Sequence, residues 1–291
     1  MFSRIKTIKE AFQNFQTLIQ RNYEIEEARS ISQIVFKEIL GYDTIQLILN
    51  ENDLLPATIF EQLDYIAFQL NEHKPIQYIM GHTEFYGLKF EVNENVLIPR
   101  PETEELVDWI IKDHKDHKDD QSLNILDIGT GSGCIPITLK YNIPQAKVNT
   151  IDVSKEAIAI ALKNSLKNNV ELFIHHQDVL LLGQLDADYD VIVSNPPYVL
   201  ESEKSEMRRN VLDYEPSLAL FVKDNDPLVF YRKIINLIEN TSTKATHLYF
   251  EINESYADEL IKLFDDQKWQ KPELRKDIRG KDRMIKAVLI R

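Results

Sequence analysis

Apolar residues recur every three or four positions along the first 70 residues, which is the spacing of amphipathic helices. The spacing is clearest in three sets, which are Ile8, Phe12, Phe15 and Ile19, then Ile31, Ile34, Val35 and Ile39, then Ile59, Leu63, Ile66 and Leu70. Gly41 and Pro56 stand where a helix ends and where one begins. The pattern predicts a helical domain over residues 1–80. It holds no cluster of catalytic residue types, so we expect it to recognise a bulky partner or to cap a second domain.

The pattern changes between residues 74 and 92. Helical spacing breaks at residues 74–81, and residues 84–92 alternate around Gly87, which predicts a β-hairpin. We expect residues 81–96 to connect the helical domain to a second domain over residues 97–291. Pro101 precedes acidic residues that suit the first turn of a helix.

Four later apolar runs predict buried strands with helical segments between them. They cover residues 123–128, 147–151, 171–174 and 189–193. Alternating strands and helices predict an α/β domain with a parallel sheet. In open sheets of this kind, ligands bind at the carboxyl ends of the strands.

Composition and charge narrow the class of protein. A chain of 291 residues with 43% hydrophobic residues fits two folded domains. Its net charge of −13 disfavours a large nucleic-acid or anionic-membrane surface, and its single cysteine, Cys134, excludes a disulfide framework or a multi-cysteine metal site. No run reaches about 18 apolar residues, and no secretion signal is visible. We expect a cytoplasmic protein without a metal site, and we interpret the charged tract 112–121, with its two histidines, as a solvated loop.

A glycine-rich segment and two acids follow the first three predicted strands. Residues 129–133 read Gly-Thr-Gly-Ser-Gly, which lets a ligand approach the backbone. Their spacing differs from the G-x-G-x-x-G dinucleotide fingerprint, which disfavours nicotinamide or flavin. Asp152 can accept hydrogen bonds from both ribose hydroxyls of a nucleoside, Asp178 can accept from an exocyclic amine, and Val179 can pack on a base.

The fourth strand leads directly into Asn195-Pro196-Pro197-Tyr198. Proline donates no hydrogen bond and restricts the residue before it, so the neighbouring carbonyls have set directions. The asparagine amide supplies an acceptor and a donor, and the tyrosine supplies a face for stacking. The segment therefore suits a flat, amide-like nitrogen, although a strand followed by a proline-rich turn would read the same way.

The combination of these motifs resembles a known family. Residues 126–133, Asp152 and residues 195–198 resemble S-adenosylmethionine-dependent methyltransferases that act on an amide or exocyclic nitrogen. The segment 98–104 (Ile-Pro-Arg-Pro-Glu-Thr-Glu), the helical N-terminus and the length resemble more narrowly the glutamine methyltransferases of peptide chain release factors. The resemblance covers nearly the whole chain.

The resemblance implies a fold, a reaction and a partner. The fold is a class I methyltransferase domain, Rossmann-like, with a seven-stranded sheet that ends in an antiparallel hairpin, preceded by a small all-α domain. The reaction transfers a methyl group from S-adenosyl-L-methionine, leaving S-adenosyl-L-homocysteine, to N5 of the glutamine in the Gly-Gly-Gln motif of peptide chain release factors. The alternatives are a ribosomal-protein glutamine, an exocyclic amine of DNA or RNA, or a non-catalytic binding module. We expect a monomer.

The resemblance also assigns residues. The catalytic residues are Asn195, Pro196 and Tyr198. The cofactor-binding residues are Gly129, Thr130, Gly131, Ser132, Gly133, Asp152, Asp178, Val179 and Asn195. The substrate-binding residues are Asn195, Pro196, Pro197, Tyr198, Arg100 and Glu102.

Two further segments of the second half fit the family pattern, and one departs from it. Residues 215–216 (Glu-Pro) match the segment after the active strand, and Asp277, Gly280 and Arg283 match a terminal Asp-x-x-Gly-x-x-Arg pattern, although turn chemistry would explain both. Asn253 and Tyr256 stand where the family usually has Gly and Gln. We expect this departure to affect a peripheral helix and to leave the motifs around the reacting atoms untouched.

Overall fold

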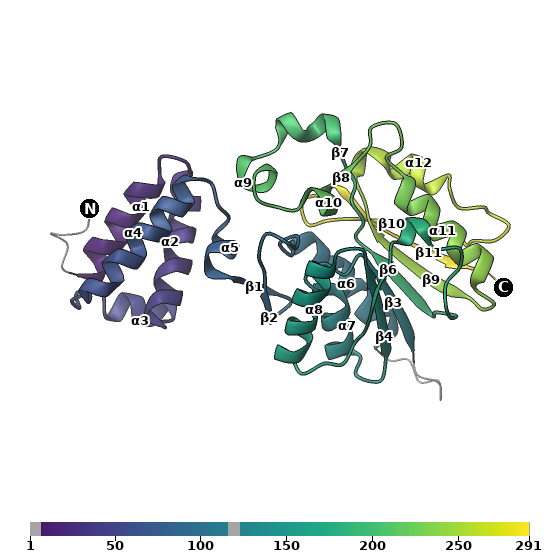
Figure 1. Ribbon diagram of the computed structural model, residues 1–291, viewed down its shortest axis with the longest axis horizontal. Coiled ribbons are helices and arrows are strands. Elements are labelled where there is room, and N and C mark those ends of the chain that lie inside the picture. The colour runs from purple at the N-terminus through teal and green to yellow at the C-terminus, as the bar shows by residue number, and fades with distance from the viewer. Residues whose placement is uncertain (1–6, 116–122, 291) are drawn as a thin grey trace. The chain divides into compact units, whose positions relative to one another are not determined.

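The computed structural model describes residues 7–115 and 123–290 (Figure 1). Contacts divide the chain into two compact units. The first combines Met1–Met80 with a later segment, Arg209–Tyr214, and the second combines Gly81–Arg208 with Glu215–Arg291. The chain therefore contributes two separate stretches to each unit.

The first unit is helical. Its helices are α1 (Ile8–Ile19), α2 (Ile25–Leu40), α3 (Thr44–Leu49), α4 (Ala57–Asn71), α5 (Ile76–Met80) and α9 (Arg209–Leu212). The predicted apolar faces of α1, α2 and α4 meet in one core, in which Phe15, Val35 and Leu63 are fully buried. Ile34 is an exception at 46% exposure, because it falls at the rim of the face that Ile31 and Val35 define. The short helix α5 was not predicted, since residues 76–80 make only a single turn or so.

Gly41 ends helix α2 in the left-handed conformation, with φ of 66°. A β-carbon added there would have no atom within 4 Å, so only backbone strain opposes a substitution. We expect Gly41→Ala to lower the free energy of unfolding by about 1 kcal/mol, measured by urea denaturation. Gly183→Ala is the matched control, because Gly183 has equal space and no positive φ. Equal stability losses in the two variants would contradict this account.

The second unit is built on a seven-stranded sheet in the order β10-β11-β9-β6-β3-β4-β5. The five parallel strands are β3 (Asn124–Ile128), β4 (Lys147–Asp152), β5 (Phe173–His176), β6 (Val191–Ser194) and β9 (Thr246–Glu251). The strands β10 (Glu273–Lys276) and β11 (Asp282–Leu289) form the antiparallel hairpin at one edge. The predicted α/β fold with an antiparallel terminal hairpin is confirmed.

Helices cover both faces of this sheet (Figure 1). One face packs against α6 (Pro101–His114) and α7 (Cys134–Asn142), with α8 (Lys155–Lys167) beside them, and the other against α11 (Val229–Thr241) and α12 (Ala257–Ile261). Successive strand residues serve opposite cores, as Tyr249 and Phe250 do in β9. Because both faces are buried, the strands read in the sequence as continuous apolar runs.

Smaller elements complete the unit. They are the hairpin strands β1 (His82–Phe85) and β2 (Leu88–Glu91), the pair β7 (Val199–Leu200) and β8 (Phe221–Val222), the helix α10 (Ser217–Leu220), and the 3₁₀ turns η1 (Val179–Leu181), η2 (Glu201–Glu206) and η3 (Glu254–Tyr256). The hairpin β1–β2 was predicted and groups with the second unit. Within residues 7–115 and 123–290, no helix is both long and apolar enough to cross a bilayer.

The charged tract at 112–121 was interpreted as a solvated loop, but its described part begins with the last turn of a helix. Helix α6 continues to His114, whose side chain is buried and lies 3.0 Å from the Tyr249 hydroxyl through Nε2. The helical period places His114 on the same face as Val107 and Ile111, so it joins the core. Residues 116–121 of the tract lie outside the described part of the chain.

The third parallel strand also differs from its predicted position. The sequence pattern places it at residues 171–174, whereas β5 spans Phe173–His176. His175 and His176 therefore lie within the strand, at the exposed edge of the sheet. Edge strands need few apolar residues, so an apolar run locates them poorly.

Candidate active site

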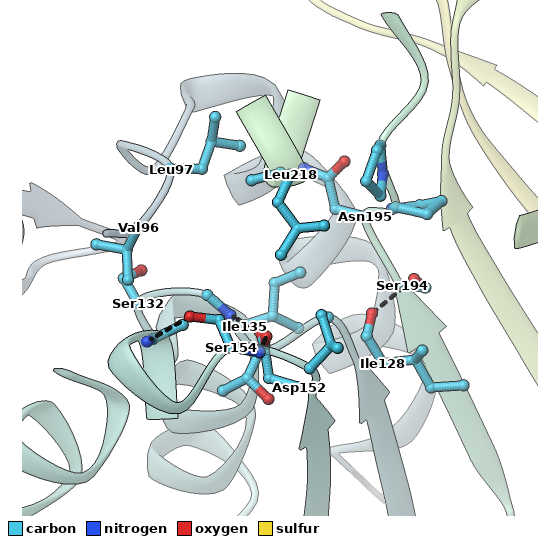
Figure 2. Close-up of a pocket in the computed structure, with 18 of the residues that line it drawn as sticks. Val96, Leu97, Ile128, Ser132, Ile135, Asp152, Ser154, Ser194, Asn195 and Leu218 are labelled. Atoms are coloured by element: carbon cyan, nitrogen blue, oxygen red, sulfur yellow. Dashed lines mark hydrogen bonds between the residues drawn. The ribbon is translucent and has the colours of Figure 1, made fainter. Parts of the chain in front are cut away.

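A cavity of about 170 Å³ lies at the carboxyl ends of β3, β4 and β6 (Figure 2). The strand order reverses here, because the chain moves from β3 outward to β4 and β5 and then returns to β6 on the other side of β3. Such reversal points are where open α/β sheets bind ligands. Each predicted strand-end motif contributes residues to this cavity, including Gly129, Asp152, Asp178 and Asn195, whereas Gly133 and Tyr198 do not line it.

The glycine-rich loop between β3 and α7 is held by its own geometry. All three glycines have positive φ, and at Gly133 an added β-carbon would lie 2.9 Å from Ile137 Cδ1. The Gly131 N–H donates to Asp152 Oδ2 at 2.8 Å, which joins the loop to the end of β4. The loop therefore presents backbone to the cavity without side chains in the way.

Asn164 of helix α8 fixes the same loop from behind. Its Nδ2 donates to the Ser132 carbonyl at 2.8 Å, and its Oδ1 accepts from the Glu91 N–H at 2.6 Å. Asn164 is fully buried, so both hydrogen bonds are shielded from water. The hairpin β1–β2 and the glycine loop are thus held by one side chain.

The Asp152 carboxylate occupies the far end of the cavity from Leu218 (Figure 2). Besides the bond from Gly131, it accepts from the Ser154 N–H at 2.8 Å through Oδ1. A carboxylate offers about four acceptor positions, so two remain for a ligand. This is the capacity that two ribose hydroxyls require.

Between these polar groups the walls are mainly apolar. Val179 is buried and lines the cavity, and Asp178 beside it uses Oδ1 to accept from the Leu180 N–H at 2.9 Å. Leu97 and Leu218 lie on the side of the cavity opposite Asp152 (Figure 2). A glycine-rich loop, a carboxylate and apolar walls fit a nucleoside.

Asn195 lies where β6 ends, and it is the start of a buried hydrogen-bond chain. Ser194 Oγ donates to the Ile128 carbonyl at 2.6 Å, which ties the ends of β6 and β3 together. Asn195 Nδ2 donates to Thr103 Oγ1 at 3.2 Å, and Thr103 Oγ1 donates to Glu251 Oε2 at 2.6 Å. The side chain that the motif supplies is therefore held by helix α6 and strand β9.

A second cavity, of about 60 Å³, adjoins the first. Asn195, Pro196 and Arg100 line both cavities, whereas Tyr198 and Glu251 line only the smaller one. The Tyr198 hydroxyl donates to Glu251 Oε1 at 3.0 Å. Asn195 and Pro196 therefore stand between a larger space and a smaller one of side-chain size.

The two predicted charged residues of the segment 98–104 have different surroundings. Arg100 Nη2 donates to Glu215 Oε1 at 2.5 Å, and burial raises the pKa of the Glu215 carboxyl while Arg100 opposes that rise. Glu215 Oε2 also accepts from the Ile98 N–H at 3.3 Å. Glu102 is not among the residues that line either cavity; its Oε1 lies 3.8 Å from Arg279 Nε.

The terminal Asp-x-x-Gly-x-x-Arg pattern forms a turn that reaches toward the site. Asp277 Oδ1 accepts from the backbone N–H groups of Arg279 and Lys281, and Gly280 has φ of 83°. Arg283 Nη1 donates to the Ile252 carbonyl at 3.0 Å. The pattern is therefore turn chemistry whose last residue supports the end of β9, beside Glu251.

Comparison with known proteins decides the family. Residues 10–81 match the model of the PrmC N-terminal domain, and residues 110–213 match that of the methyltransferase small domain. The release factor glutamine methyltransferase of Flavobacterium psychrophilum is 46% identical over 91% of this chain and 93% of its own length. The chain belongs to the release factor glutamine methyltransferase family. The family member from Bacteroides thetaiotaomicron is 45% identical over 92% of this chain and 95% of its own length.

Solved structures agree with the methyltransferase fold of this family. The catalytic domain of hMettl16, in complex with MAT2A 3′UTR hairpin 1, superposes with a TM-score of 0.53 at 15% identity. The match covers 78% of this chain and 90% of that one. The resemblance to this family that was inferred from the segment 98–104 and from residues 195–198 is confirmed.

Sequence reasoning assigned no role to two residues that the structure places at the site. Thr103 lies inside the segment 98–104, and Glu251 lies within the run 248–252, which is otherwise apolar. Both are almost fully buried, at 2% and 1% exposure. A carboxylate in an apolar strand is a recognisable signal, because glutamate is almost never fully buried without partners.

The departure from the family pattern at Asn253 also reaches the site. Asn253 Nδ2 donates to the Tyr198 carbonyl at 3.3 Å, and Asn253 Oδ1 accepts from the Ser255 N–H at 3.0 Å. The expectation that this departure leaves the active motif untouched is therefore wrong for Asn253. Glycine at this position would offer no side chain to hold that carbonyl.

Asp127 should make the free energy of unfolding depend on pH. Its side chain is fully buried in β3, Oδ2 accepts from Thr150, and Oδ1 has no hydrogen-bond partner among the described residues. Burial raises the pKa of Asp127 to about 7, and Asp152 adds to the rise.

The folded state therefore holds this proton after the unfolded chain, with its pKa of about 3.9, has lost it. Wild-type stability relative to Asp127→Asn should be highest below pH about 4 and should fall as the pH rises to about 7. Urea unfolding of both proteins across this range measures the difference. Parallel stability curves would contradict the assignment, and Asp258→Asn, on the exposed face of α12, is the control.

Proposed function

We propose that this protein transfers the methyl group of S-adenosylmethionine to N5 of the glutamine in the Gly-Gly-Gln motif of peptide chain release factors. Membership of the release factor glutamine methyltransferase family supports the reaction and the acceptor. The observation that carries the proposal is the position of Asn195 and Pro196 between two adjoining cavities. The larger suits the methyl donor, and the smaller suits the amide of one glutamine side chain.

An amide nitrogen is a poor nucleophile because its lone pair is delocalised into the carbonyl. In this proposal Asn195 Oδ1 and the Pro196 carbonyl accept the two N–H groups of the substrate amide, and Tyr198 packs against its plane. Both acceptors interact more strongly as the nitrogen gains positive charge, so they favour the transition state over the bound substrate. Alignment of the nitrogen with the methyl group can contribute roughly 7–11 kcal/mol.

The proposed donor-binding roles fall to residues that line the larger cavity. Asp152 accepts from the ribose hydroxyls, Asp178 from the exocyclic amine of the base, and Val179 packs on the base. S-adenosylmethionine supplies a methyl group on a sulfonium, so that a nitrogen–carbon bond forms as the carbon–sulfur bond breaks and a thioether leaves. The alkylated nitrogen is acidic enough to lose its proton to water, so the chain needs no general base.

The remaining predicted roles concern the protein substrate. Arg100 lines both cavities, and together with Glu102 it is proposed to contact the release factor around the glutamine. The helical unit is proposed to recognise the body of the release factor. Exposed apolar side chains on this unit support the proposal, because Ile45, Ile48 and Leu49 of α3 are each more than half exposed.

Methyl transfer from isotope-labelled S-adenosylmethionine tests the proposal. Purified release factor, ribosomes and DNA serve as parallel acceptors, and mass spectrometry then locates the added methyl group. We expect label only on the release factor, at the glutamine of its Gly-Gly-Gln loop. Label on ribosomes or DNA alone, or no transfer to the release factor, would refute the proposed acceptor.

A further inference from the structure

Two buried side chains behind the proposed active site form one connected chain with it. Thr103 Oγ1 lies 3.2 Å from Asn195 Nδ2 and 2.6 Å from Glu251 Oε2. The other oxygen of Glu251 lies 3.0 Å from the Tyr198 hydroxyl. The buried carboxyl of Glu251, at the end of β9, is therefore linked directly to Tyr198 and, through Thr103, to Asn195.

The direction of these hydrogen bonds follows from counting protons. A threonine hydroxyl has one proton, and Thr103 donates it to Glu251 Oε2 at 2.6 Å, while the other oxygen of Glu251 accepts from the Tyr198 hydroxyl. Toward Asn195 the same hydroxyl can then only accept. The Asn195 amide must therefore turn its NH2 group to Thr103, and its oxygen must point the other way.

This orientation is the one that the proposed reaction requires. We propose that Thr103 and Glu251 are positioning residues that fix the Asn195 amide with Oδ1 toward the acceptor glutamine, an inference that rests on the proposed function. A flipped amide would point its oxygen at the Thr103 lone pairs and present a donor to the substrate N–H groups. The flipped state loses the buried hydrogen bond between Asn195 and Thr103. It also places the NH2 group of Asn195 against the NH2 group of the substrate, so that two donors face each other.

The hydrogen bonds of Glu251 fit this role. The carboxyl accepts on both oxygens, from Thr103 on one and from Tyr198 on the other. Burial raises the pKa of the carboxyl, and the hydrogen bonds from Thr103 and Tyr198 and the nearby Arg283 guanidinium oppose that rise. Glu251 also lines the smaller cavity, so its hydrogen bonds lie beside the space proposed for the amide.

The fixed orientation therefore makes the site selective between glutamine and glutamate. Asn195 Oδ1 and the Pro196 carbonyl are both acceptors, so they match an NH2 group and oppose a carboxylate oxygen. If Asn195 is free to flip, its NH2 group becomes available to a carboxylate. Loss of Thr103 or Glu251 should then weaken the discrimination as well as the rate, which loss of structural support alone would not do.

The central variant is Thr103→Val, which keeps the shape of the side chain and removes the hydroxyl. We expect kcat for methylation of the release factor to fall by about 10- to 100-fold, with the Kd for S-adenosylmethionine changed less than about threefold. Thr103→Ser should restore kcat to within about threefold of wild type, because it restores the hydroxyl. The matched control is Thr138→Val, since Thr138 is equally buried and its Oγ1 has no partner among the described residues.

A binding experiment separates positioning from general support. Release factor carrying glutamate in place of the acceptor glutamine is compared with the natural protein for its Kd. Wild type and Thr138→Val should prefer glutamine, and Thr103→Val and Glu251→Gln should reduce that preference by about tenfold. Unchanged kcat and an unchanged preference in Thr103→Val would overturn the proposal. A lower kcat with an intact preference and a lower melting temperature would also overturn it, in favour of a structural role.

The inference can also be tested without any acceptor protein. In 15N-resolved NMR spectra, the Asn195 side-chain NH2 signals, assigned by their absence in Asn195→Asp, should show one proton protected from exchange in wild type. That protection should be lost in Thr103→Val and kept in Thr138→Val. If wild type leaves the release factor unmethylated, the proposed function fails, and these spectra still decide whether Thr103 holds the amide. Equal exchange in wild type and Thr103→Val would refute it.

Discussion

Asn195→Ala is expected to lower kcat for methyl transfer by about 10²- to 10³-fold, which is the usual effect of removing one preorganised polar contact to a transition state. The Kd for S-adenosylmethionine should rise less than about tenfold, because the glycine loop and Asp152 remain. Single-turnover methyl transfer measures the rate, and isothermal titration calorimetry measures the affinity. The expected pattern is thus nearly normal donor binding with almost no product.

The control for this variant is Asn236→Ala, on the exposed face of helix α11. It makes the same chemical change away from both cavities and should retain wild-type kcat and Kd. Full turnover by Asn195→Ala would end the proposal that its amide holds the substrate nitrogen. A large loss of donor affinity with normal turnover at saturation would instead make Asn195 chiefly a donor-binding residue.

Asp152→Ala should have the second largest effect, on donor affinity. Hydrogen bonds to a charged group are worth about 1.5–3 kcal/mol each, so loss of the two proposed ribose contacts should raise the Kd for S-adenosylmethionine by at least about 10²-fold. The variant also removes the partner of the Gly131 and Ser154 N–H groups, which should loosen the glycine loop. Calorimetric titration with S-adenosylhomocysteine measures the loss without turnover.

Asp258→Ala, an exposed carboxylate in α12, is the control for charge alone. Asp152→Asn distinguishes the two contributions, because an asparagine oxygen can still accept from one of the two backbone N–H groups. It should therefore bind the donor more tightly than Asp152→Ala and less tightly than wild type. An unchanged Kd in Asp152→Ala would remove Asp152 from the donor site.

The parallel sheet could be predicted because its central strands are buried on both faces. Such strands read as continuous apolar runs, and the runs that predicted the central strands β3, β4 and β6 lie within two residues of their observed bounds. The site motifs could also be predicted from the sequence, since each is a short local segment that directly follows a strand. Parallel strands bring their carboxyl ends to one edge, so Gly129, Asp152 and Asn195 were expected to meet there, and they do.

The support behind the motif could not be predicted in the same way. Thr103 and Glu251 touch each other across 148 positions of sequence, and no local pattern encodes such a contact. The fold alone brings the first turn of α6 against the end of β9. Likewise, the placement of Glu102 beside Arg279 depends on where the β10–β11 turn lies, which its own sequence does not specify.

The bounds of the edge strand and the burial of one histidine were also hard to predict from the sequence. The edge strand β5 spans Phe173–His176, whereas the apolar run that predicted it lies two positions earlier, at residues 171–174. His114 looked solvated because charged residues surround it in the sequence, but helical periodicity turns it inward. In both cases the prediction relied on adjacent residues in the sequence, whereas position in the folded structure decides strand bounds and burial.

The return of Arg209–Tyr214 to the helical unit has a consequence for exchanging parts between relatives. The Tyr214 hydroxyl donates to the Glu72 carbonyl at 2.8 Å within that unit, so the unit is not one continuous stretch of chain. A chimaera that takes only Met1–Met80 from a relative would pair a foreign helical bundle with a native segment from the far side of the sequence. Grafts of the helical unit should therefore carry both pieces together, so that the contact between them is kept.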